Sequence, residues 1–440
     1  MYLWRKAIGV IVVSILAASG VVLLGSAQEK PYEGMVLRLA SMSDQFADYL
    51  KVLGRKFEEV SGARVEVDIL GYTELYQKIT QDYATHTKQY DLATVDIVWT
   101  GEFAEKGWTV DLTPLILRDY EEIDVPDILP VMWAQGSWEG KQIAFPMAGY
   151  ANSLIYRKDL FSDPKEQADF KAKYGYDLRP PRTMKELADI ATFFTRPEEN
   201  LYGLAANGAR GPAVAQDWME YMRAFGGQII DENGKVVVDS PECLAALKFF
   251  VDIFDKWAPP GAIGYWWDDR ETSYRTGQSV MQSSWSIARA GYEDPSISRV
   301  VGKTGMATTP SAPAINPKFG FGGWGIGINA DISSERQAAA WAFIKWITSP
   351  EIQKEWMLHD GAPTRLSTLL DPELNQKMPW LHTMLKLFIH GDGDYRPRVP
   401  EYSRIQDILG LRINQAITHE LTPEEALSKA AEEIRAIYGQ

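Results

Sequence analysis

The chain has 440 residues and a formal net charge of −14 at pH 7, with 45% hydrophobic and 24% charged residues. This length predicts roughly two to three domain-sized units, and the composition is ordinary for a water-soluble globular protein. The negative charge argues against nucleic acid and anionic lipid surfaces as partners. Cys243 is the only cysteine, and the five histidines show no metal-binding spacing, so we expect neither a disulfide, nor a metal site, nor a cofactor.

The first 27 residues have the pattern of an export signal. Arg5 and Lys6 precede an apolar stretch over 7–24, and Gly25-Ser26-Ala27 offers small residues for cleavage. No cysteine follows the cleavage site, so we expect no lipid anchor. An uncleaved membrane anchor is the alternative, because the apolar stretch is almost long enough to span a bilayer. We expect cleavage after Ala27 and a periplasmic location.

The following segment alternates between strand and helix patterns. Strands are predicted over 36–40, 65–69 and 92–99, because apolar residues alternate or run continuously there. Helices are predicted over 46–57 and around 75–79, where apolar residues recur at helical spacing. A β-α-β-α-β order predicts a parallel sheet with helical crossovers.

The central and C-terminal parts carry clear start signals. The capping boxes Thr183-x-x-Glu186 and Thr422-x-x-Glu425 each predict the start of a helix, and Ser240-Pro241 predicts another. Asn233-Gly234 between apolar pairs predicts a hairpin. Two further helices are predicted over 338–347 and 350–358.

A glycine-rich stretch, FGFGGWGIGI over 319–328, says most about function. Glycines let a ligand approach the backbone closely, and Trp324 offers a flat apolar face with an N–H on its edge, which suits a sugar ring. The stretch also contains G-x-G-x-x-G. We exclude a dinucleotide site because the strand pattern continues and Lys345 and Trp346 stand where an acidic residue is required.

Seven segments together resemble a known family. They are YDLATVDIVWTGEFAEKGW, GKQIAFP, LIYRKDLF, FGGWGIGI, AAAWAFIKWITSPEIQ, GAPTR and the tail over 397–430. In this order the chain resembles family 1 extracellular solute-binding proteins, the sugar-capture subunits of ABC importers, and is similar to maltose- and trehalose/maltose-binding proteins. The resemblance covers essentially the whole mature chain.

The resemblance implies an α/β fold of the two-lobed periplasmic-binding-protein type (type II), with hinge-linked lobes that are discontinuous in sequence. We expect an N-lobe over 34–148 plus 325–370 and a C-lobe over 149–322 plus 372–440. Crossings are expected near Tyr150, Gly323 and Leu370.

Several ligand-binding residues follow from the resemblance. Asp96 matches the family's sugar-binding aspartate, and Trp285 and Trp324 match tryptophans that face the ligand. The amide of Gly323 is expected to donate to a hydroxyl. The alternatives are a carboxylate satisfied by local backbone amides and ordinary core tryptophans.

Other candidates depart from the family pattern or are shared only with some relatives. Tyr150 stands where close relatives have an aspartate, Asn152 is expected to restore a polar contact, and hinge packing is the alternative. Arg365 corresponds to an arginine that reaches the sugar in some relatives, with a surface salt bridge as the alternative. Asp44 and Gln45 are expected at the cleft edge. Trp266-Trp267-Asp268-Asp269 ranks lower, as a C-lobe wall or an anchored loop.

The sequence therefore predicts a monomeric, exported binding protein that captures a disaccharide or small oligosaccharide by hinge closure and delivers it to ABC permease subunits. A second hypothesis keeps the fold and changes the ligand to a polyol, a monosaccharide or a sugar phosphate. A third is an exported carbohydrate-active enzyme, although no G-x-S-x-G or H-E-x-x-H motif is present and we assign no catalytic residue.

Overall fold

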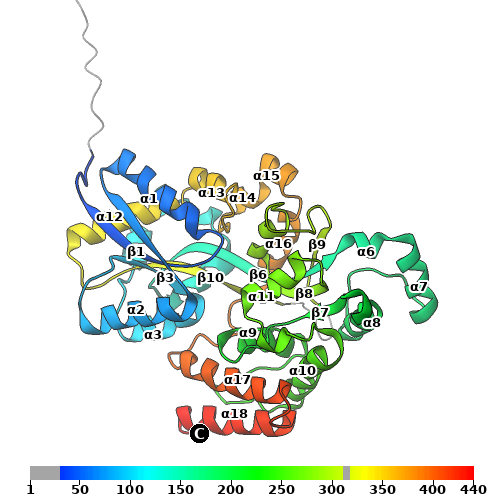
Figure 1. Cartoon of the computed structure of the whole chain (residues 1–440). Coiled ribbons are helices and arrows are strands. Elements are labelled where there is room, and N and C mark those ends of the chain that lie inside the picture. The colour runs from blue at the N-terminus through cyan, green and yellow to red at the C-terminus, as the bar shows by residue number, and fades with distance from the viewer. Residues whose placement is uncertain (1–29, 311–317) are drawn as a thin grey trace, which may run out of the picture.

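The computed structural model describes residues 30–310 and 318–440 (Figure 1), so the predicted export signal over 1–27 lies outside the described residues. Its main sheet has the strand order β2-β1-β3-β10-β6-β8-β7, with β9 beside β6 and β11 beside β10. The strands are β1 (Val36–Met42), β2 (Arg64–Leu70), β3 (Leu92–Asp96), β6 (Phe145–Arg157), β7 (Tyr202–Ala205), β8 (Ser279–Trp285), β9 (Thr304–Ala307), β10 (Phe319–Ile328) and β11 (Gly391–Asp392).

Helices gather around the two ends of this sheet (Figure 1). Around β1, β2 and β3 lie α1 (Ala47–Ser61), α2 (Tyr72–Thr85), α3 (Thr100–Glu105) and α12 (Ser334–Ile347), with α13 (Pro350–Met357), α14 (Leu366–Leu370), α15 (Pro372–Lys377) and α16 (Leu381–Ile389) following along the chain. Toward β7 and β8 lie α6 (Lys158–Ser162), α7 (Pro164–Tyr174), α8 (Met184–Phe194), α9 (Pro212–Ala224), α10 (Pro241–Asp252), α11 (Trp267–Arg275), α17 (Tyr402–Ile417) and α18 (Pro423–Tyr438). In the described ranges, no helix combines the length and the apolar character that crossing a bilayer requires.

The N-terminal strands confirm the predicted parallel arrangement. β1 pairs in parallel with both β2 and β3, and α1 and α2 form the crossovers. The apolar residues Leu50, Leu53 and Phe57 of α1 are buried, as their helical spacing predicts. The predicted third strand is shorter than expected. Residues 97–99 form a 3₁₀ turn that leads into α3, so β3 ends at Asp96.

The predicted helix starts are also found. The hydroxyl of Thr183 accepts a hydrogen bond from the amide of Glu186 at 3.1 Å, which caps α8. Ser240 caps α10, and the Thr422–Glu425 capping box begins α18. The predicted hairpin is reduced to an isolated bridge between Ile230 and Val236 around a turn at Gly234, so it adds no strand to a sheet.

Two long antiparallel strands, β6 and β10, occupy the middle of the sheet. On one side β10 pairs with β3, which sets Trp324 opposite Asp96, and on the other it pairs with β6. Further along, β6 pairs with β8, which sets Asn152 opposite Trp285. The glycine-rich stretch is thus a fully buried strand that does not open a helix, in agreement with the exclusion of a dinucleotide site.

Glycine is required at the centre of β10. Gly323 has φ +134°, and a Cβ at this position would lie 2.2 Å from the carbonyl oxygen of Ala148. Both the positive φ and the close approach of β6 exclude a larger residue.

We expect Gly323→Ala to lower the free energy of unfolding by at least about 2 kcal/mol, because the variant combines backbone strain with a steric clash. Urea unfolding followed by tryptophan fluorescence measures this. Gly264→Ala is the matched control, since an added Cβ there meets no atom within 4 Å and φ is not positive. Equal stability of the two variants would contradict this account of β10.

Candidate ligand-binding site

A cavity of about 200 Å³ lies at the carboxyl ends of β1, β2 and β3. This edge is where open α/β sheets bind ligands, because the turns that follow the strands converge there. One wall comes from those turns and from β6 and β10. It consists of Met42, Ser43, Asp44, Gln45, Gly71, Tyr72, Asp96, Tyr150 and Trp324.

The second wall comes from the other half of the molecule. It is formed around the start of α11, by the end of β8 and the turn after it, and by two residues from the C-terminal part of the chain. Its residues are Trp266, Trp267, Asp268, Arg270, Glu271, Trp285, Ile287, Ala288, Arg396 and Gln406.

Aromatic rings from both walls meet around the cavity. The ring of Tyr72 lies 5.8 Å from that of Trp267 and 6.1 Å from that of Trp324, and Tyr150 packs edge-on against Trp285 at 5.2 Å. Trp324 is only 2% exposed, and its indole N–H has no hydrogen-bond partner among the described residues. The cavity therefore offers apolar ring surface, while the indole N–H of Trp324 is buried away from it.

Asp96 is a buried carboxylate that the protein itself holds. The hydroxyl of Tyr72 donates to its Oδ2 at 3.0 Å, and Nη2 of Arg396 lies 3.5 Å from its Oδ1. Burial raises the pKa of Asp96, and the positive charge of Arg396 opposes this shift. Arg396 is itself buried, and its Nε has no hydrogen-bond partner in the described part of the chain. Asp96 thus orients two cavity residues as well as lining the cavity.

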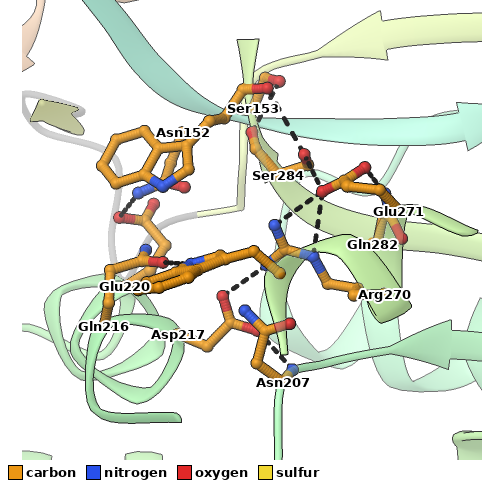
Figure 2. A network of polar contacts seen from close by, with 12 residues as sticks. Asn152, Ser153, Asn207, Gln216, Asp217, Glu220, Arg270, Glu271, Gln282 and Ser284 are labelled. Atoms are coloured by element: carbon orange, nitrogen blue, oxygen red, sulfur yellow. Dashed lines mark hydrogen bonds and ion pairs between the residues drawn. The ribbon is translucent and has the colours of Figure 1, made fainter. Parts of the chain in front are cut away.

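Glu271 lines the cavity, but donors of the protein occupy both its oxygens (Figure 2). Arg270 and Ser284 each donate to Oε1 at 2.8 Å. Oε2 accepts a hydrogen bond from Gln282 at 2.7 Å and another from the hydroxyl of Tyr292. This carboxylate therefore has little capacity left for a ligand.

The same buried network fixes the second wall. Arg270 is 1% exposed and also pairs with Asp217 at 2.6 Å, whose other oxygen accepts the amide of Asn207 (Figure 2). The indole of Trp267 donates to Gln216 at 3.0 Å. These contacts tie the start of α11 to α9, so the second wall is held rigidly.

Asp44 is a cavity carboxylate with few protein donors. Its Oδ1 accepts the backbone amide of Gln45 at 2.8 Å. Burial raises the pKa of Asp44 to about 7, the Gln45 amide and the Tyr150 hydroxyl oppose the shift, and the negative charges of Asp268 and Glu271 add to it. Asp44 therefore retains acceptor capacity for a ligand that donates hydrogen bonds.

Six of the nine predicted ligand residues line this single cavity. They are Asp44, Gln45, Asp96, Tyr150, Trp285 and Trp324. The lower-ranked tryptophans 266 and 267 line it too, together with Asp268. Residues from five distant parts of the sequence are thus brought together.

Three predicted residues do not line the cavity. Gly323 precedes Trp324 on β10, and its Cα faces the carbonyl of Ala148, because neighbouring residues of a strand face opposite sides. Asn152 is buried and donates to Glu220 and to the Tyr395 hydroxyl, both at 3.2 Å.

The expectation for Arg365 is corrected by the structure. Arg365 is 1% exposed and donates to the carbonyl of Ile123 at 2.7 Å and to the carbonyl of Thr348. It also pairs with Asp127 at 3.3 Å. It therefore ties two loops together, does not line the cavity, and is not a surface salt bridge.

Sequence reasoning missed Tyr72, Arg396 and Gln406. Tyr72 follows β2 at its carboxyl end, as Asp44 follows β1. Ligands of open α/β sheets bind at these ends, so the reasoning that selected Asp44 would also have selected Tyr72. Arg396 and Gln406 lie far along the chain and carry no comparable local signal.

The chain matches the bacterial extracellular solute-binding protein family over residues 40–354. An ABC transporter solute-binding protein from Agrobacterium radiobacter, solved in complex with ribitol, is 42% identical, with a TM-score of 0.86 over 93% of this chain and 100% of that one. Maltose-bound MalE3 of T. maritima is 30% identical, with a TM-score of 0.80 over 92% of this chain and 100% of that one. The mannitol-binding protein of Pseudomonas aeruginosa is 26% identical over 90% of this chain and 91% of its own length.

These similarities and the two-walled cavity define a periplasmic-binding-protein fold of type II. The chain belongs to the bacterial extracellular solute-binding protein family and is the solute-binding protein of an ABC transporter.

The raised pKa of Asp44 predicts how stability depends on pH. The ordinary pKa of an aspartate is 3.8, and that of Asp44 in the folded state is about 7. Between these two pH values the folded state binds a proton at Asp44, whereas the unfolded state does not. Protonation of Asp44 therefore stabilises the folded state at low pH. This stabilisation is lost as the pH rises toward 7. We expect the melting temperature of ligand-free Asp44→Asn to fall less between pH 5 and 8 than that of the unaltered protein.

Differential scanning fluorimetry in ligand-free buffer measures both slopes. Asp48→Asn is the control, because Asp48 is exposed on α1 outside the cavity and should leave the slope unchanged. Parallel curves for Asp44→Asn and the unaltered protein would show that the Asp44 carboxyl titrates normally.

The corrected position of Arg365 gives a second prediction. We expect Arg365→Lys to lower the free energy of unfolding by about 1.5–3 kcal/mol, because a lysine cannot reproduce the planar set of donors toward two carbonyls. Calorimetric affinity of the folded variant for its ligand should stay within about twofold of the original. A tenfold loss of affinity in a fully folded variant would return Arg365 to the site.

Proposed function

We propose that this protein captures a small polyol of about five or six carbons. The observation that carries this proposal is the cavity volume of about 200 Å³. It lies below the roughly 300 Å³ at which the usual range of small-molecule pockets begins. The volume favours the polyol hypothesis over the disaccharide or oligosaccharide that was expected first.

The chemistry of the lining supports a polyhydroxylated ligand. Asp44 supplies an acceptor, while the hydroxyl of Ser43 and the side-chain amide of Gln45 supply donors at the same cavity. Hydroxyl groups donate and accept, so they satisfy both kinds of group. The aromatic rings supply surface for the carbon chain.

The charges of the lining disfavour the sugar phosphate alternative. Four carboxylates line the cavity, against two arginines, and both arginines are already paired with carboxylates. An anionic ligand would enter without a free cation to receive it. Among the relatives, the ribitol complex and the mannitol-binding protein agree with a neutral polyol.

The mechanism we propose is closure of two lobes over the ligand. The lobes are those expected from the sequence, 34–148 plus 325–370 and 149–322 plus 372–440. The second wall falls in the second lobe, and the first wall falls in the first lobe except for Tyr150 and Trp324, which lie near the expected crossings. A ligand that contacts both walls favours the closed form by its differential contacts. The closed protein then delivers the polyol to the membrane permease subunits of the transporter.

We further propose that the protein is exported with residues 1–27 removed and acts as a monomer in the periplasm without a lipid anchor. It makes or breaks no bond in its ligand. The relatives are binding proteins by name, which supports this over the carbohydrate-active enzyme.

Isothermal titration calorimetry with ribitol, mannitol and maltose tests the ligand class. We expect ribitol or mannitol to bind at least about tenfold more tightly than maltose, because the cavity is too small for two rings. NMR of the recovered ligand should show it unchanged. Tighter binding of maltose would restore the disaccharide hypothesis, and a reaction product would restore the enzyme.

Trp285 provides a mutational test of the site. It is half-buried, packs against Tyr150 and lies 5.4 Å from the guanidinium of Arg396. We expect Trp285→Ala to weaken polyol binding at least about tenfold, because it removes ring surface and releases Arg396.

Trp346→Ala is the matched control for Trp285→Ala. Trp346 is also half-buried but packs against Phe57 on α1, outside the cavity. It should lower stability without changing affinity. An equal effect of both variants on affinity would place the site elsewhere.

A further inference from the structure

We propose that the preferred ligand is a polyol that carries a protonated primary amine, bound more tightly than the neutral polyol of the same chain length. This inference rests on the proposed function, since it names the ligand of the same cavity more narrowly. It comes from the charges and the ring surface of the lining.

The lining holds more negative charge than the protein itself neutralises. Arg270 is shared between two carboxylates, Asp217 at 2.6 Å and Glu271 at 2.8 Å, and Arg396 lies beside Asp96. One guanidinium between two carboxylates leaves one negative charge over. Both arginines are therefore fully compensated and do not repel a cationic ligand.

Two further carboxylates add to this excess. Within residues 30–310 and 318–440, neither Asp44 nor Asp268 forms an ion pair with a lysine, arginine or histidine. Asp44 belongs to the first wall, whereas Asp268 and Glu271 belong to the second. The negative charges of Asp268 and Glu271 raise the pKa of Asp44. One unpaired carboxylate from each wall, Asp44 and Asp268, thus faces the cavity.

The surrounding rings favour a cation as well. Tyr72, Trp266, Trp267 and Trp285 line the same cavity, and aromatic faces attract ammonium groups most strongly where water is excluded. An ammonium group among these rings and beside Asp44 would satisfy the excess charge that a neutral polyol leaves in place.

The remainder of the ligand must still be a polyol. Ser43 and Gln45 line the cavity with a hydroxyl and a side-chain amide, whose donors require acceptors, and an ammonium group offers none. Hydroxyl oxygens along the carbon chain supply those acceptors. An amine at one end and hydroxyls along the rest therefore match the donors and acceptors of the cavity together.

Three probes with one carbon skeleton test this inference: sorbitol, 1-amino-1-deoxysorbitol and gluconate. They carry a terminal hydroxyl, ammonium or carboxylate group, and near pH 7 an alkyl amine is fully protonated. Titration calorimetry of the whole mature protein at low salt should show the amine binding at least about tenfold more tightly than sorbitol. Gluconate should bind more weakly than sorbitol.

Variants locate the preference. Asp44→Asn should reduce the ratio of amine to sorbitol affinity to within about threefold, and Asp48→Asn, outside the cavity, should preserve it. If Asp44→Asn fails to fold, Asp268→Asn replaces it. Asp268 is exposed at the cavity, and its loss should also lower the ratio.

The outcomes separate this inference from the proposed function. Binding of ribitol, mannitol or sorbitol that is as tight as or tighter than that of the amine would overturn the cationic preference and leave the polyol assignment standing. Tight binding of the amine without measurable binding of any neutral polyol would support the preference and overturn the neutral assignment. Binding of neither class would overturn both.

Discussion

The pairing of β10 between β3 and β6 is the constraint on which the site depends. It sets Trp324 opposite Asp96 and, through β6, brings Tyr150 and Trp285 to the same cavity. This pairing requires backbone to approach backbone so closely that Gly323 cannot carry a side chain. The glycines of β10 therefore act through strand packing, and the ligand surface comes from the tryptophan among them.

Buried charges set the second constraint. Burying an isolated charge is costly, so the protein surrounds Arg270 and Glu271 with partners until each is satisfied, and it holds Arg396 against Asp96. The result is a rigid wall whose carboxylates are mostly occupied. Asp44 differs, because its partners leave acceptor capacity, and it is the position at which a ligand changes the electrostatic balance most.

The size and the chemistry of the cavity constrain the ligand independently. Its volume limits how large a ligand is enclosed, whereas the free donors and acceptors determine which groups the ligand carries. The small volume and the negative lining both support the proposed small polyol.

The sequence by itself determined the parallel β1–β3 unit, the helix starts at Thr183, Ser240 and Thr422, and the family. Local periodicity and capping chemistry carry that information over a few residues. It also placed Asp44 after the first strand, where ligands bind, whereas only the structure ended β3 at Asp96. Only the tertiary structure decided that Arg365 joins two loops and that Arg396 reaches the cavity, because both depend on contacts between residues far apart in sequence. Which carboxylate stays free was also decided there, since a side chain's neighbours set its hydrogen bonds and local sequence does not.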